Sequence, residues 1–547
     1  MRRQIPMTIT PFWRRQESII SAAILIGGLF SASAVLGIAR EYLLAYYFGD
    51  SAPLSLFYLA DRIPSFVFNV LVVGSFATAF IPVFIKQFKK SEGDAWYLAS
   101  QALNATLSVF ALISVTLIIL APYVVSGLTS GRLSSAESLT LAALFRVMLL
   151  AQLILIISTF LTALLQSFNH FLMPALAPVC YNVGLIVGVI VAGRFGILYA
   201  AWGMVGGALI HLLIQLPQVR RLKFNYRLIL DFKFAPFLEM LRLLLPRTLG
   251  VVVAQISVLV DTYLAASLSV AAIVPYTRAL KLQNLPLGVF GLAMSQALFP
   301  TLSQKALGEN RTEFRKVFLT SFTQLAFLIM PVAAIFLVLR VPVARLVFGT
   351  SLVSWEATLT TSYALAFFAL ALFPQAANLS LIKAFYALYD TKTQLIVSGL
   401  ATLLNIVVAV AFLQLGGFGV WGLSLAYLVS SSLECGGLLF MLSKKVGGFP
   451  WQQFGKPLFK ILMATFIMAG FLYLPLKKLD LFVLDTRWTF NLLGLSTISC
   501  LLGLVIYLTL TYLFKVQEIV LLWKLLRKIG FNVKASPSPE TIVYGSN

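Results

Sequence analysis

Apolar runs long enough to cross a membrane recur along almost the whole chain, from Ser18 to Lys515. A helix needs about 20 predominantly apolar residues to span the hydrocarbon core of a bilayer. The mean hydropathy of the 547 residues is +0.94, and only 11% of them are charged, against about 25% in a soluble domain. The chain is therefore expected to be an all-α polytopic membrane protein without a sizeable soluble domain.

The hydropathy pattern predicts about fourteen transmembrane helices. The first apolar run follows an arginine-rich start, as in a signal peptide, but it is too long for a signal-peptide core and no convincing cleavage site follows it, so we expect a retained span. The expected spans lie near residues 18–39, 55–86, 95–122, 138–167, 172–193, 197–219, 235–266, 270–303, 314–339, 358–388, 394–415, 418–443, 457–475 and 489–514.

Lysine and arginine are divided unevenly between the two sides of the expected membrane. The chain has 41 Lys and Arg against 19 Asp and Glu, a net charge of +22. With the N-terminus inside, the inside loops and span ends hold roughly 27 of these basic residues and the outside loops about 7. We therefore attribute the excess charge to topology and to attraction for anionic lipid, and not to a nucleic-acid partner. Both termini are expected to be cytoplasmic.

The sequence repeats itself at an offset of about 217 to 219 residues, with about six spans in each copy. For example, Phe76–Pro82 resembles Met294–Pro300. An even number of spans makes the repeats parallel, related by a pseudo-two-fold axis along the membrane normal. We therefore expect a cytoplasmic segment 1–17, an N-lobe 18–226, a C-lobe 227–447, an added helix pair 448–515, and a cytoplasmic amphipathic helix with a disordered tail over 516–547.

Charged side chains inside the expected spans are the candidates for a binding site. An ionised group at mid-bilayer costs roughly 3 kcal/mol or more, so such groups usually face a bundle interior or a wet cavity. Guanidinium groups bind phosphate bidentately, and more strongly where the dielectric is low, which predicts an anion-binding cavity between the lobes. Glu41 and Asp61 are candidate counter-ions, and each is expected to pair across helices because sequence neighbours on a helix point about 100° apart. The candidate substrate-binding residues are Arg40, Glu41, Asp61, Arg62, Arg278 and Lys281.

Asp261 is the most isolated acidic residue within a span. It could bind a coupling cation or carry a proton, and a purely structural pairing with Arg242, Arg247 or Arg278 is an equal alternative. For Arg146, Arg242 and Arg247 themselves we favour pairing or snorkelling to an interface over substrate binding.

An enzymatic function is disfavoured. The chain has two histidines, His170 and His211, and no Walker A motif, so neither a histidine-based catalytic set nor ATP hydrolysis is indicated. The three cysteines lie in apolar segments without metal spacing. We expect a transporter without a cofactor, whose energy source is left open between a coupling cation (Na⁺ or H⁺) and the membrane potential.

Several motifs, in order along residues 18–515, resemble those of the MurJ/MviN lipid II flippase family. They are Leu36–Glu41 followed by Tyr47–Gly49, then Gly74–Val83, Asn169–Pro178 with Asn182, Pro286–Val289 through Leu298–Pro300, and Tyr389–Thr393. The resemblance implies the multidrug/oligosaccharidyl-lipid/polysaccharide exporter fold, with two six-helix lobes, two added helices and alternating access. It also implies movement of lipid II, the undecaprenyl-pyrophosphate-linked peptidoglycan precursor, to the outer leaflet of a bacterial inner membrane. Lipid II, membrane lipids and cell-wall synthesis proteins are the implied partners.

The resemblance also carries over to single residues. Arg40 matches the family's first-helix arginine, and Glu41 stands where an aspartate is common. Lys281 aligns with its eighth-helix arginine, and Arg62 with a frequently basic position. The chain departs from the family's pattern, in which arginines and a glutamate are found, at Ala34, Phe68 and Val73.

Two alternatives to lipid II transport stay open, and the departures bear on the first of them. One is a flippase for another polyprenyl-pyrophosphate-linked polysaccharide, and the other is a cation-coupled multidrug exporter of the same fold, although the latter would favour an acidic cavity.

Overall fold

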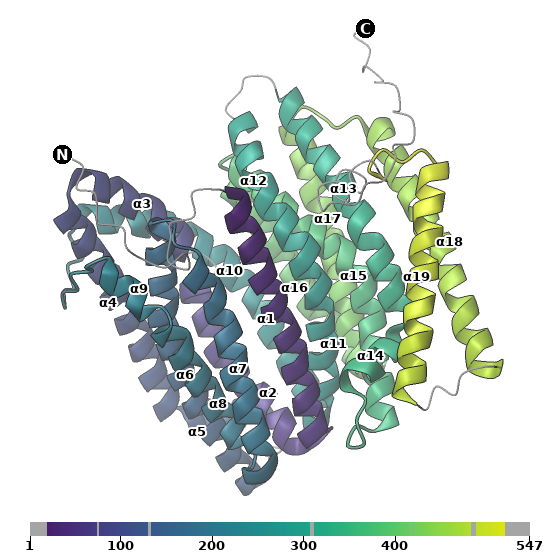
Figure 1. Cartoon of the computed structure of the whole chain (residues 1–547), viewed down its shortest axis with the longest axis horizontal. Coiled ribbons are helices and arrows are strands. Elements are labelled where there is room, and N and C mark those ends of the chain that lie inside the picture. The colour runs from purple at the N-terminus through teal and green to yellow at the C-terminus, as the bar shows by residue number, and fades with distance from the viewer. Residues whose placement is uncertain are drawn as a thin grey trace.

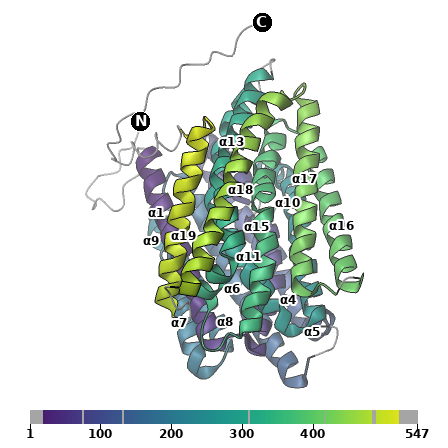
Figure 2. The ribbon, with the colours of Figure 1, turned by 90° about the vertical axis from the view of Figure 1, so that its right-hand side faces the viewer.

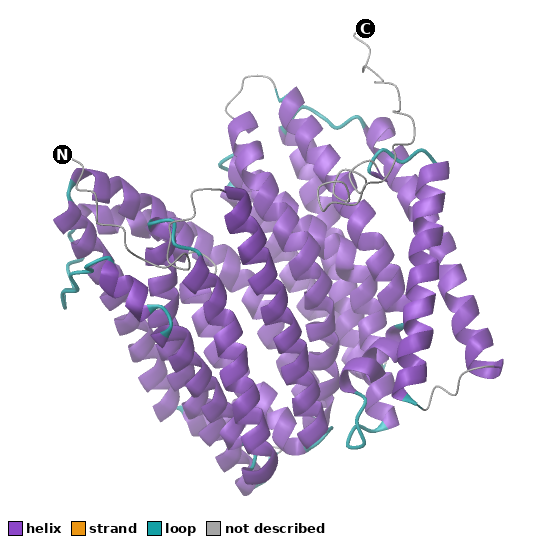
Figure 3. Cartoon of the chain, in the orientation of Figure 1, coloured by secondary structure: helices purple, strands orange, loops and turns teal. Residues whose placement is uncertain are grey.

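A computed structural model describes residues 19–73, 76–129, 133–306, 311–415, 417–482 and 488–519. Within these ranges all regular structure is helical (Figure 3). In this part of the chain, thirteen helical segments are long and apolar enough to cross a membrane, and each overlaps one expected span. The remaining expected span, 18–39, falls on helix α1. The all-α polytopic membrane fold is therefore confirmed, whereas the segment 1–17 and the tail from residue 520 lie outside the described residues.

The described residues of the first half form nine α-helices. They are α1 (Ile19–Phe48), α2 (Ala52–Phe68), α3 (Phe76–Lys90), α4 (Glu92–Ile119), α5 (Ala121–Thr129), α6 (Ser135–Ser167), α7 (Leu172–Phe195), α8 (Leu198–Leu213) and α9 (Leu216–Arg221). Polar caps fix two of the starts: the Ser91 hydroxyl accepts from the Asp94 amide, and Ser134 forms a capping box with Glu137.

The second half, as far as the structure describes it, forms eight α-helices, and a final pair follows. They are α10 (Ala235–Leu268), α11 (Ile273–Pro286), α12 (Ala293–Ala306), α13 (Thr312–Val338), α14 (Arg340–Phe348), α15 (Trp355–Ala387), α16 (Thr391–Leu415), α17 (Gly419–Lys445), and the pair α18 (Trp451–Phe482) and α19 (Thr489–Leu513). The pair packs on α13 and α14 at the outer edge of the second half, at the right in Figure 1 and toward the viewer in Figure 2.

Each half contains a membrane helix that is interrupted by a π-helical segment. In the first half, the segment Asn69–Val73 follows α2, which contains Pro64. In the second half, Leu287–Leu292 directly follows α11, which ends at Pro286. Proline removes a backbone hydrogen bond, and π-helical turns commonly mark such breaks at functional positions. The two segments start about 218 residues apart, an offset similar to that of the sequence repeats.

Glycines bring α7 and α8 into backbone contact. A Cβ atom at Gly188 would lie 2.3 Å from the Cα atom of Gly203, and one at Gly184 would lie 2.4 Å from that of Gly207. Small residues four apart allow this close approach between membrane helices. Since α1 packs on α7, the glycine contact helps to determine where α7 presents its polar side chains to α1.

The two halves are joined by helix α10, which also packs on α3 of the first half, and by further contacts at one end of the molecule. Helix α10 contacts elements of both halves, α2 packs on α11, and α1 packs on α14. Ala45 shares an apolar cluster with Tyr276 and Phe348. In Figure 1 the halves meet at the lower end, where α1 passes into α2, and their ribbons diverge toward the upper end, where α1 begins.

Candidate functional site

A cluster of polar side chains is centred on Glu41, which is 5% exposed. Arg40 donates from Nη2 to Glu41 Oε1 at 2.7 Å and from Nε at 3.1 Å. Lys281 Nζ donates to the same oxygen at 2.7 Å, and the Tyr58 hydroxyl donates to Oε2 at 2.8 Å. One carboxylate therefore joins α1, α2 and α11, and with them the two halves of the molecule.

The pairing of Arg40 corrects the expectation from sequence. Glu41 does pair across helices with Lys281, but Arg40 binds its own sequence neighbour. The Cβ atoms of Arg40 and Glu41 point in different directions, but the arginine side chain is long and flexible enough to bend back to Glu41. The backbone geometry of the helix therefore does not determine the position of the guanidinium.

The two cations of the cluster remain accessible although the carboxylate is enclosed. The side chain of Lys281 is 31% exposed and that of Arg40 is 22% exposed. The Lys281 ammonium also lies 4.1 Å from the centroid of the Tyr58 ring, a cation–π contact. Tyr58 thus holds both members of the Glu41–Lys281 pair.

Asn182 on α7 holds the outer part of the Arg40 guanidinium. Its Oδ1 accepts from Arg40 Nη1 at 3.2 Å. Its Nδ2 donates to Ser33 Oγ at 3.0 Å and to the carbonyls of Ser33 and Pro178, both at 3.2 Å. Because the amide nitrogen is fixed by three acceptors, the amide oxygen is fixed toward Arg40.

Arg62 and Asp61 lie near this cluster and have partners of their own. Arg62 Nη2 donates to Thr277 Oγ1 at 2.9 Å, and Arg62 is close enough to Lys281 for the two charges to repel. Arg62 Nε is buried without a partner among the described residues. Asp61 Oδ1 accepts from Ser65 Oγ at 2.9 Å. Arg62 therefore retains a hydrogen-bond donor that an anion could use.

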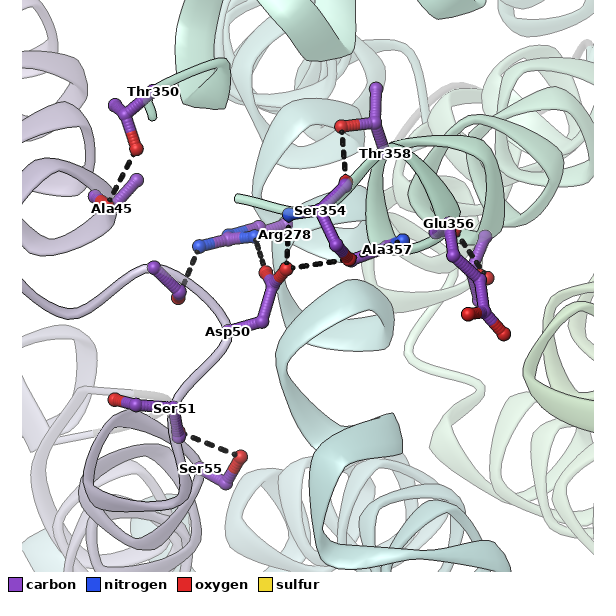
Figure 4. A network of polar contacts seen from close by, with 12 residues as sticks. Ala45, Asp50, Ser51, Ser55, Arg278, Thr350, Ser354, Glu356, Ala357 and Thr358 are labelled. Atoms are coloured by element: carbon purple, nitrogen blue, oxygen red, sulfur yellow. Dashed lines mark hydrogen bonds and ion pairs between the residues drawn. The ribbon is translucent and has the colours of Figure 1, made fainter. Parts of the chain in front are cut away.

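Arg278 belongs to a different network from Lys281, although the two residues are one helical turn apart. It is 1% exposed. Its Nη1 donates to Asp50 Oδ1 at 2.8 Å, and its Nη2 donates to the Gly49 carbonyl at 2.7 Å (Figure 4). The structure thus does not bring Arg278 into the Glu41 cluster, and its expected role in substrate binding stays a prediction.

Asp261 on α10 is buried among neutral groups. Its Oδ1 accepts from Asn405 Nδ2 at 3.0 Å, and its Oδ2 accepts from the Tyr276 hydroxyl at 3.1 Å. The alternative that Asp261 pairs with Arg278 is wrong, because that guanidinium binds Asp50. Arg242 is exposed, and the side chain of Arg247 lies outside the described residues.

Glu434, a second carboxylate with neutral hydrogen-bond partners, was not identified as a candidate from the sequence. Glu434 on α17 accepts from Ser398 Oγ at 2.5 Å and from Asn378 Nδ2 at 3.0 Å. The available signal was an acidic residue inside the apolar run 418–443. Tyr58 was also missed, and it carried no comparable signal because a tyrosine in a membrane span is common.

The Glu41 cluster has the chemistry of an anion site. The three cations Arg40, Arg62 and Lys281 outnumber the two carboxylates Glu41 and Asp61. Arginine donors match the geometry of phosphate oxygens, and a low local dielectric strengthens the contact. An incoming anion could therefore compete with Glu41 for the two accessible cations.

Comparison with known proteins supports a single family. The family model described as lipid II flippase MurJ matches residues 44–513. The lipid II flippase MurJ of Burkholderia cenocepacia is 27% identical over 470 residues, which cover 83% of this chain and 90% of that protein. The probable lipid II flippase MurJ of Thermotoga maritima is 27% identical over 491 residues, with coverage of 89% and 95%.

The fold is also found in solved structures. A structure described as lipid II flippase MurJ in an inward closed conformation superposes with a TM-score of 0.74 at 23% identity, covering 90% of this chain and 98% of that one. An inward-facing multidrug resistance MATE family transporter of the MOP superfamily superposes with a TM-score of 0.64 at 16% identity, covering 78% and 98%. At these identities the likeness shows a shared fold.

Proposed function

The chain belongs to the lipid II flippase MurJ family, and from this premise we propose that it carries lipid II from the inner to the outer leaflet of a bacterial inner membrane by alternating access. The relative from Burkholderia cenocepacia bears the name of this activity. Family membership makes the chain a transporter and favours lipid II over another polyprenyl-pyrophosphate-linked polysaccharide or a multidrug substrate.

The observation that carries the proposal is the cation cluster between the two halves. Arg40 comes from the first half and Lys281 from the second, and both hold Glu41. The pyrophosphate of lipid II is a compact anion that suits these donors together with Arg62. Without substrate, Glu41 compensates the buried positive charge; with substrate, the pyrophosphate takes over part of that role.

The prenyl tail would stay in lipid while the headgroup occupies the site. Helices α18 and α19 offer apolar side chains for that tail, since Phe459 and Phe466 on α18 and Val505 on α19 are among the exposed large hydrophobic residues. Rocking of the two halves about their interface would then transfer the headgroup between the two sides of the membrane.

A driving force and an orientation complete the proposal. Asp261 is the proposed coupling site, for Na⁺ or H⁺, because a buried carboxylate with neutral partners gains from binding a cation. The membrane potential is the alternative energy source. We propose that both termini lie in the cytoplasm, because the basic loops are expected on that side. Cell-wall synthesis proteins are the proposed partners.

Complementation of a strain depleted of its lipid II flippase tests the proposal. We expect wild type to restore growth and Arg40→Ala to fail, because the site loses an accessible cation and leaves Glu41 less compensated. Arg146→Ala, which removes an exposed arginine from α6, is the matched control and should restore growth. All three proteins are compared at equal membrane abundance.

Two results would count against the proposal. If cells with Arg40→Ala grew as well as cells with wild type, the Glu41 cluster would not be needed for transport. Failure of abundant, folded wild type both in cells and in a vesicle assay of lipid II exposure would reject lipid II and favour another polyprenyl-linked glycan.

A further inference from the structure

The turn between α1 and α2 is held by a buried arginine from the other half of the molecule. Arg278 binds both the Asp50 carboxylate, at 2.8 Å, and the Gly49 carbonyl, at 2.7 Å. Its guanidinium also lies 5.3 Å from the centroid of the Phe348 ring. Figure 4 shows Arg278 reaching the turn at Asp50. One side chain of α11 thus binds both the main chain and a side chain of the turn.

Asp50 connects the same turn to a second element of the other half. Its Oδ2 accepts from the Ser354 amide at 2.7 Å and from the Ser354 hydroxyl at 2.9 Å. Ser354 is the N-cap of α15 and in turn accepts from the amide of Ala357. The Asp50 carboxylate is therefore shared between α11 and the start of α15, as Figure 4 shows.

The backbone of the turn fits closely against the loop before α15. Gly49 has φ +52°, and a Cβ atom there would lie 2.0 Å from the Leu352 carbonyl oxygen. Only glycine accommodates both the left-handed conformation and this approach. Thr350 Oγ1 also donates to the Ala45 carbonyl at 3.0 Å. The polar contacts thus continue the apolar packing of Ala45 with Tyr276 and Phe348.

Because it is buried, this contact is expected to be either formed and dry or broken and hydrated. Arg278 is 1% exposed, and its Nε has no partner among the described residues, so the guanidinium depends on Asp50 and Gly49. A buried charge that loses its partner is strongly unfavourable unless water reaches it. Separation of the halves at this end must therefore break the contact and hydrate both ions together.

We propose that Arg278, Asp50 and Gly49 form a latch. The latch holds the two halves together at the end of the molecule where the α1–α2 turn lies. The latch is closed in the conformation described, because Arg278 contacts both Asp50 and Gly49. At the opposite end the ribbons of the halves diverge in Figure 1 apart from α10, which packs on α3. Lys281 lies one turn along α11 from Arg278, and both side chains bind the first half. An anion that draws Lys281 away from Glu41 acts on the helix that carries the latch. This inference rests on alternating access in the proposed function, but its test measures conformation and not transport.

Distances between spin labels test the latch in purified full-length protein in lipid nanodiscs. The three native cysteines are replaced, and one label pair is placed at the exposed positions Ala52→Cys and Glu356→Cys beside the latch. We expect Asp50→Asn and Arg278→Gln each to raise the population with long distances several-fold. A second pair, Lys90→Cys and Gln304→Cys, reports on the opposite end, where distances should shorten.

Two comparisons separate a latch from a general loosening of the structure. Lys445→Gln breaks an ion pair with Asp390 within the second half and should leave both distances unchanged. The double variant of Asp50→Asn with Arg278→Gln should shift the distances no more than one single variant, because both remove the same contact.

Unchanged distances in Asp50→Asn would overturn the latch, and this result is decisive even if Arg278→Gln does not fold, since Asp50 is in a turn. Shifted distances in a protein that exposes no lipid II would uphold the latch and count against the proposed function.

Discussion

Tyr58 illustrates how much of the site depends on a residue without charge. Its hydroxyl donates to Glu41 and its ring lies against the Lys281 ammonium. A hydrogen bond to a charged group contributes about 1.5–3 kcal/mol, and a cation–π contact adds about 0.5–2 kcal/mol. Tyr58 is therefore a positioning residue for both members of the ion pair that connects the halves.

Substitution of Tyr58 should separate these two contributions. We expect Tyr58→Phe to lower the initial rate of lipid II exposure in vesicles several-fold, because only the hydrogen bond is lost, and Tyr58→Leu to lower it further. Tyr363→Phe alters a tyrosine that is 47% exposed and serves as the control. Equal rates for Tyr58→Phe and wild type would show that the hydroxyl does not position Glu41.

Among elements, the α7–α8 pair shows how packing sets the position of a polar group. Asn182 can fix Arg40 only if α7 lies at its observed depth against α1. That depth depends on the contact of Gly188 and Gly184 with α8, where backbones meet without intervening side chains.

A methyl group at this contact should destabilise the fold. Gly188→Ala places a Cβ atom 2.3 Å from Gly203 Cα, and such overpacking typically costs about 1–3 kcal/mol. We expect a lower thermal unfolding midpoint in detergent. Gly206→Ala, whose Cβ atom would meet nothing within 4 Å, should leave the midpoint near that of wild type. If both variants melted like wild type, the close approach would not be needed for stability.

For the whole molecule, two carboxylates of the second half, the buried Asp261 and the partly buried Glu434, are candidates for the proposed coupling of transport to an ion. Asp261 and Glu434 lie on α10 and α17, and each accepts hydrogen bonds from neutral side chains. Our proposal places coupling at Asp261 and not at Glu434, because Asp261 is almost fully buried, at 1% exposure, and because α10 contacts both halves. Binding of a cation there would alter the helix that both halves share.

Removal of the charge at Asp261 should uncouple transport from its ion. Lipid II exposure by wild type in vesicles is expected to respond to an imposed Na⁺ or H⁺ gradient, and Asp261→Asn should reduce that response at least several-fold. Glu434→Gln is the matched comparison and should retain the response. A response kept by Asp261→Asn and lost by Glu434→Gln would move the coupling site to α17.

The class of protein, the approximate positions of the spans and the residues that could form a site were predicted from the amino-acid sequence alone. Hydrophobic runs and charges are local properties, so spans and candidates such as Arg40 and Lys281 could be found without knowledge of the fold. The internal repeat predicted two lobes, and the family motifs added the exporter fold to which such lobes belong.

The pairing of the charged side chains became known from the packing of the helices. Glu41 and Lys281 are 240 residues apart in sequence, and Arg278 and Asp50 are 228 apart. Helical periodicity places Arg278 and Lys281 on one face, but it does not specify the neighbouring helix or the depth at which that helix packs. The two residues therefore have separate partners, and the positions of Tyr58 and Asn182 follow from packing between helices that no local pattern encodes.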